Sequence, residues 1–173
     1  MAEFEYRKGN IFESNAVALF NPVNCKGVMG KGLALQFKEK FPDNERSYIV
    51  TCHRRNMRPG KVHVFGLKHK DYPTLELIFN FPTKDDWRNP SKIEYIEDGM
   101  LDAANILKIL KIESVAIPKL GCGLGGLNWK DVHEVIYKAL VKVEGLKVFI
   151  YGENPKKRTR KKPAEKVETK EES

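Results

Sequence analysis

Glycine residues gather at two places in the sequence where a bound anion can be held. The first segment, 27–32, and the second, 121–126, each follow an apolar run and precede a segment with helical spacing. Without side chains, backbone N–H groups can approach a phosphate closely, and the start of the following helix attracts negative charge. Either segment alone is compatible with an ordinary tight turn. Two of them predict a ligand that contains a diphosphate.

Strands and helices alternate around these segments. We expect strands at 4–8, 16–23, 62–67, 75–80, 114–117 and 146–151. We expect helices at 32–41, 91–110 and 129–143, with a further helical segment at 43–54. Pro42 should end the first helix, and Ser91 should be the N-cap of the long one. Because the strands are continuous apolar runs, the pattern predicts an α/β fold whose mixed or mostly parallel sheet is covered on both faces.

Two common nucleotide-binding motifs do not fit the glycine segments. In GVMGKG, Gly32 stands where a P-loop needs Ser or Thr, and Cys25 stands where its first glycine belongs. Gly121, Gly123 and Gly126 form a GxGxxG pattern, but no acidic ribose-binding residue follows at the right distance. The sequence therefore supports neither a P-loop NTPase nor a Rossmann dehydrogenase.

The composition indicates one domain, 1–153, with a basic tail at 154–173. The tail supplies about half of the formal net charge of +8 and almost no core residues, so we expect it to be disordered. Its PKKRTRKKP stretch is either a solubilising segment, a nucleic-acid contact or a nuclear-import signal. Three cysteines without ligand spacing predict neither disulfides nor a metal site. With no signal peptide and no membrane span, we expect a cytoplasmic monomer, or a nuclear protein if the tail directs import.

Four motifs, in this order, resemble those of macrodomains: YRKGNIF, NPVNCKGVMGKGLALQF, FPTKDDWR and IPKLGCGLGGLNW. The resemblance covers residues 4–151 and implies a three-layer α/β/α macrodomain that binds ADP-ribose. Within the family, the motifs are most similar to the DarG antitoxins, which belong to a lysine-dependent class and remove ADP-ribose from thymidine in DNA. That similarity implies ADP-ribosylated DNA as substrate, a cognate ADP-ribosyltransferase toxin as a possible partner, and no cofactor.

The resemblance also implies which residues bind the ligand. Asn10, where many macrodomains carry aspartate, would accept a hydrogen bond from the adenine amino group through its carbonyl oxygen. Asn24 would hold the distal ribose. The remaining binding residues would be Gly9, Ile11, Cys25, Gly27, Val28, Met29, Gly30, Lys31, Gly32, Thr83, Gly121, Cys122, Gly123, Leu124, Gly125, Gly126 and Tyr151. For Lys31 and Tyr151, the alternatives are an exposed lysine and a tyrosine at the core margin, and Cys25 and Cys122 should pack without acting as nucleophiles.

Lys84 is the catalytic residue that the resemblance implies, together with Asn24. MacroD-type hydrolases use an aspartate beside the first glycine segment, and residues 24–34 contain none. A lysine near the anomeric carbon can act as an amine nucleophile or as a charged acid toward the leaving base, and the sequence leaves both open. Gly125 stands where protein-directed relatives carry aspartate, which favours DNA as the substrate.

We therefore expect an ADP-ribosyl glycohydrolase that acts on thymidine-linked ADP-ribose in DNA. The alternatives are an ADP-ribose 1''-phosphate phosphatase, a protein de-ADP-ribosylase, and a non-catalytic ADP-ribose reader with a passive Lys84. Trp87 and Arg88, just beyond Lys84, could stack on and neutralise a nucleic-acid strand. The other interpretation is that Trp87 anchors its own loop.

Overall fold

The computed structural model describes residues 1–157, and within them six strands form one sheet. The strands are β1 (Glu3–Arg7), β2 (Ala18–Val23), β3 (His63–Gly66), β4 (Leu77–Pro82), β5 (Ser114–Pro118) and β6 (Lys147–Tyr151). Their order is β1-β6-β5-β2-β4-β3, and each neighbouring pair is parallel except β3 with β4. The predicted mixed, mostly parallel sheet is confirmed. The tail residues 158–173 lie outside the described part of the chain.

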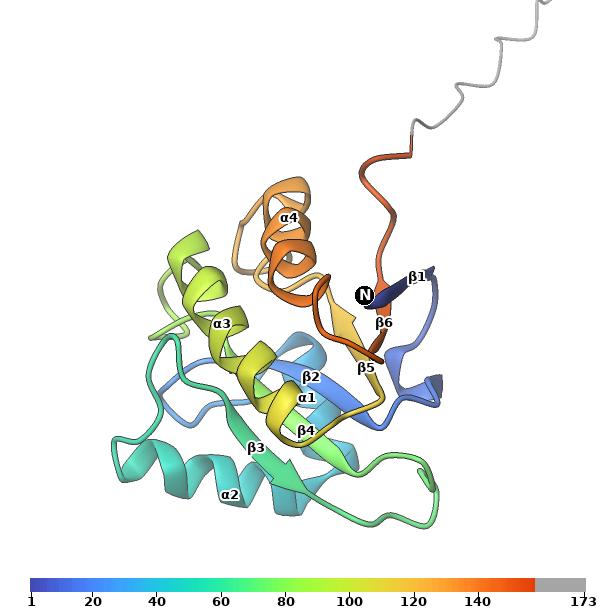
Figure 1. Ribbon diagram of the computed structural model, residues 1–173. Coiled ribbons are helices and arrows are strands. Elements are labelled where there is room, and N and C mark those ends of the chain that lie inside the picture. Colours follow the sequence, from blue (N-terminus) through green and yellow to red (C-terminus); the bar gives the residue numbers. More distant parts are fainter. Residues whose placement is uncertain (158–173) are drawn as a thin grey trace, which may run out of the picture.

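Helices cover both faces of this sheet (Figure 1). They are η1 (Ile11–Glu13, a 3-10 turn), α1 (Gly32–Lys40), α2 (Pro42–His53), α3 (Ile93–Ile109) and α4 (Trp129–Leu140). In β2, Ala18 and Phe20 belong to the core cluster formed with α3 and α4, whereas Leu19 belongs to the cluster formed with η1 and α1. Alternate residues of a strand thus pack on opposite layers, which explains why the strands are continuous apolar runs. The three-layer α/β/α arrangement is confirmed.

One expected helix end is confirmed and one is wrong. The first helix stops before Pro42 as predicted: α1 ends at Lys40 and Phe41 has a non-helical φ of −131°. Pro42 is itself the first residue of α2, a position that tolerates proline because its missing N–H has no helical partner there. The N-cap of α3 is Lys92 rather than Ser91, and its side chain makes no capping hydrogen bond. Ser91 is instead buried, with 6% of its surface exposed. The backbone N–H of Ser91 donates to the carbonyl of Gly125, so Ser91 packs against that loop instead of capping α3.

Gly99 in α3 lies directly against the ring of Phe81 in β4. A Cβ at this position would be 2.4 Å from Phe81 Cζ, and the ring is fully buried and stacked with Phe20. Alanine normally stabilises a helix by up to about 1 kcal/mol relative to glycine. Because overpacking a core costs about 1–3 kcal/mol, we expect Gly99→Ala to lower the free energy of unfolding by roughly 1–2 kcal/mol. Urea denaturation measures this, with the exposed Asn105→Ala as a control that should not destabilise; a gain at Gly99 would contradict the packing.

One buried histidine, His133, and one half-buried histidine, His63, predict how stability depends on pH. Burial lowers the pKa of both His63, which shares a hydrogen bond of 3.0 Å with Ser47 Oγ, and His133, which shares one of 2.6 Å with the Tyr6 hydroxyl. The unfolded chain therefore binds these protons at a higher pH than the folded protein does. We expect the free energy of unfolding to fall as the pH drops below about 6.5, the usual histidine pKa. His133→Gln should weaken this dependence in denaturation at a series of pH values, and an unchanged slope would contradict it.

The described chain continues past the predicted domain boundary at 153. Lys156 lies over the ring of Tyr137 in α4, 4.5 Å from its centroid, and pairs with Glu134 at 3.9 Å. The Trp129 indole N–H donates to the carbonyl of Glu153 at 2.9 Å. Lys156, beyond the predicted boundary, thus contacts α4. Among the helices of residues 1–157, none is both long and apolar enough to cross a membrane.

Candidate functional site

The carboxyl ends of β1, β6, β5, β2 and β4 lie at one edge of the sheet, because these strands are parallel. The segments 8–11, 24–32, 83–92 and 119–128 follow four of them and therefore start at the same edge, where β6 ends at Tyr151. All the residues predicted to bind or react belong to these segments or are Tyr151. The fold thus brings the predicted site together at the edge where α/β proteins bind ligands.

Asn24 shapes the first glycine segment from within. Its Nδ2 donates to the carbonyl of Val28 at 2.7 Å, and its Oδ1 accepts from the backbone N–H of Lys26 at 2.9 Å. The Tyr48 hydroxyl of α2 lies 2.7 Å from the Asn24 carbonyl and 3.0 Å from its Oδ1. An amide nitrogen carries two N–H groups, so the second one can still serve a ligand. Tyr48 was missed by sequence reasoning, although Asn44, Tyr48 and Cys52 recur at a spacing of four residues, as one helix face requires.

The side chains of the first glycine segment divide between core and solvent. Cys25 and Met29 are buried in a cluster with Tyr48, so their side chains pack in the core, whereas Val28 is 41% exposed. Burial raises the pKa of the Cys25 thiol to about 12, and that of Cys122 to about 11. Both thiols are protonated at neutral pH, which agrees with the packing role predicted for them.

Backbone hydrogen bonds hold Lys84 beside the first glycine segment. Thr83 N–H donates to the carbonyl of Val23, and Cys25 N–H donates to the carbonyl of Asp85, both at 2.9 Å. These bonds extend the pairing of β2 with β4 beyond the strand ends. The half-buried Lys84 side chain reaches the Trp87 carbonyl at 3.4 Å. A bond of that length constrains the ammonium group weakly, so it can turn toward a ligand.

The far end of the Lys84 segment is tied to the second glycine segment. Ser91 N–H donates to the carbonyl of Gly125 at 3.0 Å, and Ser91 Oγ has no hydrogen-bond partner among residues 1–157. A Cβ at Gly125 would be 2.3 Å from Ser91 Oγ and 2.4 Å from the Gly121 carbonyl oxygen. Only glycine fits there. Segment 83–92 therefore joins the residues just before the first glycine segment to the second glycine segment.

Positive backbone φ angles explain several of the glycines. Gly27 and Gly32 have φ of 83° and 58°, and Gly121 and Gly126 have 71° and 79°, which L side chains rarely adopt. The tip of the second segment carries Leu124, which is 72% exposed. Both predicted loops thus need glycine for their shape.

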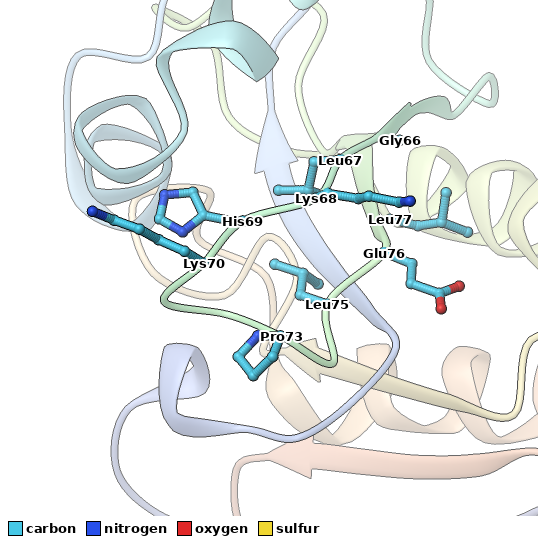
Figure 2. Close-up of a pocket in the computed structure, with 9 residues that line it drawn as sticks. All are labelled: Gly66, Leu67, Lys68, His69, Lys70, Pro73, Leu75, Glu76 and Leu77. Carbon is cyan, nitrogen blue, oxygen red and sulfur yellow. The ribbon is translucent and has the colours of Figure 1, made fainter.

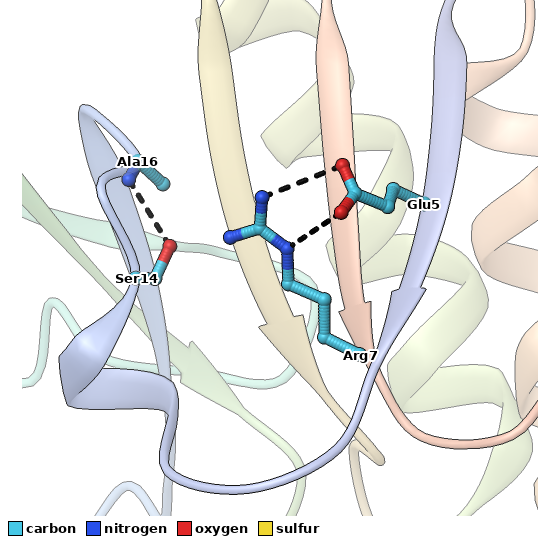
Figure 3. A network of polar contacts seen from close by, with 4 residues as sticks. All are labelled: Glu5, Arg7, Ser14 and Ala16. Carbon is cyan, nitrogen blue, oxygen red and sulfur yellow. Dashed lines mark hydrogen bonds and ion pairs between the residues drawn. The ribbon is translucent and has the colours of Figure 1, made fainter.

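At the β1 end of the site, the Asn10 side chain already accepts a hydrogen bond from the backbone. Its Oδ1 accepts from Phe12 N–H at 2.9 Å and caps η1, which leaves one lone pair for a ligand. Arg7, at the end of β1, binds Glu5 through two hydrogen bonds of 3.1 and 3.4 Å (Figure 3). Its guanidinium lies 3.7 Å from the Phe149 ring centroid. Tyr151 is half-buried and packs at the margin of the cluster that contains Phe149.

Three fully buried asparagines lie below the first glycine segment. Asn21 and Asn44 each donate from Nδ2 to Asn80 Oδ1 at 3.1 Å, and Asn80 donates to Asn44 Oδ1 at 2.8 Å. Moving α2 away from β2 and β4 would leave buried polar groups of this network unpaired, so the network holds α2 in place. This fixes the helix that carries Tyr48.

Trp87 is 49% exposed and belongs to none of the core clusters of the described chain. The Arg88 guanidinium lies 5.0 Å from its ring centroid. Its exposure does not fit a tryptophan that anchors its own loop.

A separate hollow of ≈ 970 Å³ lies along the loop between β3 and β4 (Figure 2). It includes Gly66, at the end of β3, and Leu77, at the start of β4, so it is at the opposite edge of the sheet. Lys68 and Lys70 point away from one another in Figure 2 and do not converge on one ligand position. No predicted site residue lies there. Within residues 1–157, no three His, Cys, Asp or Glu side chains gather in a way that suits a metal ion.

The family model described as Macro domain matches residues 20–136. The chain belongs to the macrodomain family. It is 45% identical over 151 residues to a DNA ADP-ribosyl glycohydrolase of Thermus aquaticus, an alignment that covers 86% of this chain and 41% of that protein. The chain thus spans about two fifths of that curated relative.

Solved structures give the same relationship. The macrodomain of Mycobacterium tuberculosis DarG superposes with a TM-score of 0.84 at 40% identity, covering 89% of this chain and all (100%) of that one. Thermosipho africanus DarTG in complex with ADP-ribose matches with a TM-score of 0.79 at 32% identity, covering 91% of this chain and 43% of that one. The similarity to DarG seen in the motifs is confirmed.

Proposed function

We propose that this macrodomain binds ADP-ribose across its two glycine segments and removes it from thymidine bases in DNA. The observation that carries the proposal is the position of Lys84, on a segment that is hydrogen-bonded at one end to Val23 and Cys25, which lead into the first glycine segment, and at the other end to Gly125 in the second. A ligand that seats its diphosphate in those segments would be held next to this lysine. The glycohydrolases of Thermus aquaticus and Mycobacterium tuberculosis, at 45% and 42% identity, support the reaction.

In the proposed reaction, Asn24 holds the ribose whose anomeric carbon is attacked. In one route, Lys84 attacks that carbon as a neutral amine, the bond to thymine breaks, and water then hydrolyses the bond to the lysine nitrogen. In the other, water attacks the carbon while the Lys84 ammonium group stabilises the departing thymine. In both routes the thymine takes up a proton and ADP-ribose is released. The close contacts at Gly125 leave no room for a carboxylate side chain at that position. This supports DNA over glutamate-linked protein, for which an aspartate there would be the general base.

The proposal also includes four further points. We propose that the protein contacts the DNA strand, has an ADP-ribosyltransferase toxin as partner, is a monomer and is cytoplasmic. The Thermosipho africanus fusion of a DNA ADP-ribosyl transferase with a DNA ADP-ribosyl glycohydrolase supports the partner class.

A comparison of three substrates tests the function. The protein is incubated with thymidine-linked ADP-ribosylated DNA, glutamate-linked ADP-ribosylated protein and ADP-ribose 1''-phosphate, and the products are separated by chromatography. We expect release from DNA at a rate well above either alternative. Faster turnover of the glutamate-linked protein or of ADP-ribose 1''-phosphate would contradict the proposal and assign the protein that activity instead. Tight binding of ADP-ribose without turnover of any substrate would make the protein a reader.

A further inference from the structure

A second cleft, of ≈ 480 Å³, lies on the outer side of the Lys84 segment. Its floor is apolar and buried, and consists of Cys25, Cys52 and Met57. It lies between the end of α2 and the first glycine segment. Nothing in the proposed reaction uses this cleft.

The rim of the cleft is basic. Lys26, His53 and Arg55 line it with exposed side chains, and Asp85 is the one acidic residue among its lining. None of the ion pairs found in residues 1–157 involves Lys26 or Arg55. These two cations are thus available to an anion from solution.

The cleft adjoins the segment that carries the reactive lysine. Asp85, which lines the cleft, follows Lys84 directly and accepts the N–H of Cys25 through its carbonyl, and Lys26 is two residues from Asn24. The nucleotides next to a modified unit that reacts at Lys84 are therefore close to this cleft. Proteins that hold single strands combine cationic grooves for the backbone with apolar surfaces for the bases.

We propose that this cleft binds the single DNA strand that continues from the ADP-ribosylated nucleotide, with Lys26 and Arg55 contacting its phosphates and the floor receiving a base. The proposal rests on the proposed function for the identity of the polymer. Its binding step can be measured without any turnover.

The test uses Lys26→Gln combined with Arg55→Asn, where asparagine is chosen because Arg55 has a φ of 57°. The control combines Lys142→Gln with Lys147→Gln, two exposed lysines near the amino end of β6, at the opposite edge of the sheet. Binding of a fluorescent, unmodified oligothymidylate is followed by anisotropy at several salt concentrations. Each lost phosphate contact should reduce the slope of log K against log salt by about 0.7. We expect a reduction of about 1.4 in the cleft variant and none in the control.

Activity gives a second readout. The cleft variant should lose about tenfold or more in kcat/KM on an ADP-ribosylated oligonucleotide, while turnover of the ADP-ribosylated mononucleoside stays unchanged. An unchanged salt slope, an equal loss in the control, or an equal loss of binding to polyglutamate would overturn the proposal. If wild type binds the oligothymidylate through the cleft but cleaves no ADP-ribosylated DNA, the proposed function fails while the strand site stands.

Discussion

Lys84→Ala is expected to lower kcat for release of ADP-ribose from DNA by about 10²-fold or more, while the Kd for free ADP-ribose changes little. Removing a single group that stabilises the transition state typically costs about 10²–10³ in rate. The backbone bonds of Thr83 and Asp85 hold the segment independently of the lysine side chain, so the substitution should leave the fold and both glycine segments intact. Single-turnover kinetics and calorimetric titration with ADP-ribose measure the two quantities.

Lys84→Arg is the matched control, and it also separates the two chemical roles. Arginine keeps the positive charge, but it cannot act as a neutral amine nucleophile. Partial activity in the arginine variant would assign Lys84 the role of a cation that stabilises the leaving base. Activity as low as in Lys84→Ala would assign it the role of nucleophile. Full activity in the alanine variant would remove Lys84 from the mechanism.

Gly125→Ala is expected to disrupt the second glycine segment. The new Cβ would overlap both Ser91 Oγ and the Gly121 carbonyl oxygen, and a backbone oxygen cannot move aside without shifting the segment. We expect kcat/KM to fall roughly 10²-fold, as displacements of about 1 Å in a site can do. The free energy of unfolding should fall by about 1–3 kcal/mol.

Gly123→Ala is the control for this second prediction. Apart from the two adjoining residues, no atom of residues 1–157 lies within 4 Å of a Cβ at Gly123. Its free energy of unfolding should stay within about 0.5 kcal/mol of wild type. Wild-type stability and ADP-ribose affinity in Gly125→Ala would show that the close approach at this glycine is not needed.

The strands and the edge where the site forms could be predicted because their signals are local. The apolar run of β2 and the glycines after it are contiguous in sequence, and they require only a parallel sheet to become a ligand-binding edge. The role of Lys84 could be predicted only from the resemblance to a family. By itself, a lysine in a polar loop is usually an exposed side chain.

Contacts between residues distant in sequence could not be predicted. Serine before a helix normally caps it, but Ser91 packs under Gly125, more than thirty residues later, and that contact overrides the local preference. Tyr48 in α2 supports Asn24, which lies in the loop after β2. Arg55 lines the cleft proposed to bind the DNA strand because the end of α2 lies beside Cys25. Each of these depends on how the layers pack.

The product formed from a thymidine-linked ADP-ribosylated single strand tests the central claim most directly. After incubation with wild-type protein, mass spectrometry of the oligonucleotide should show that the whole ADP-ribosyl group is lost and that the unmodified strand is restored. Free ADP-ribose should appear in equal amount. An oligonucleotide that keeps its full modification, in a sample where the protein binds ADP-ribose, would contradict the account.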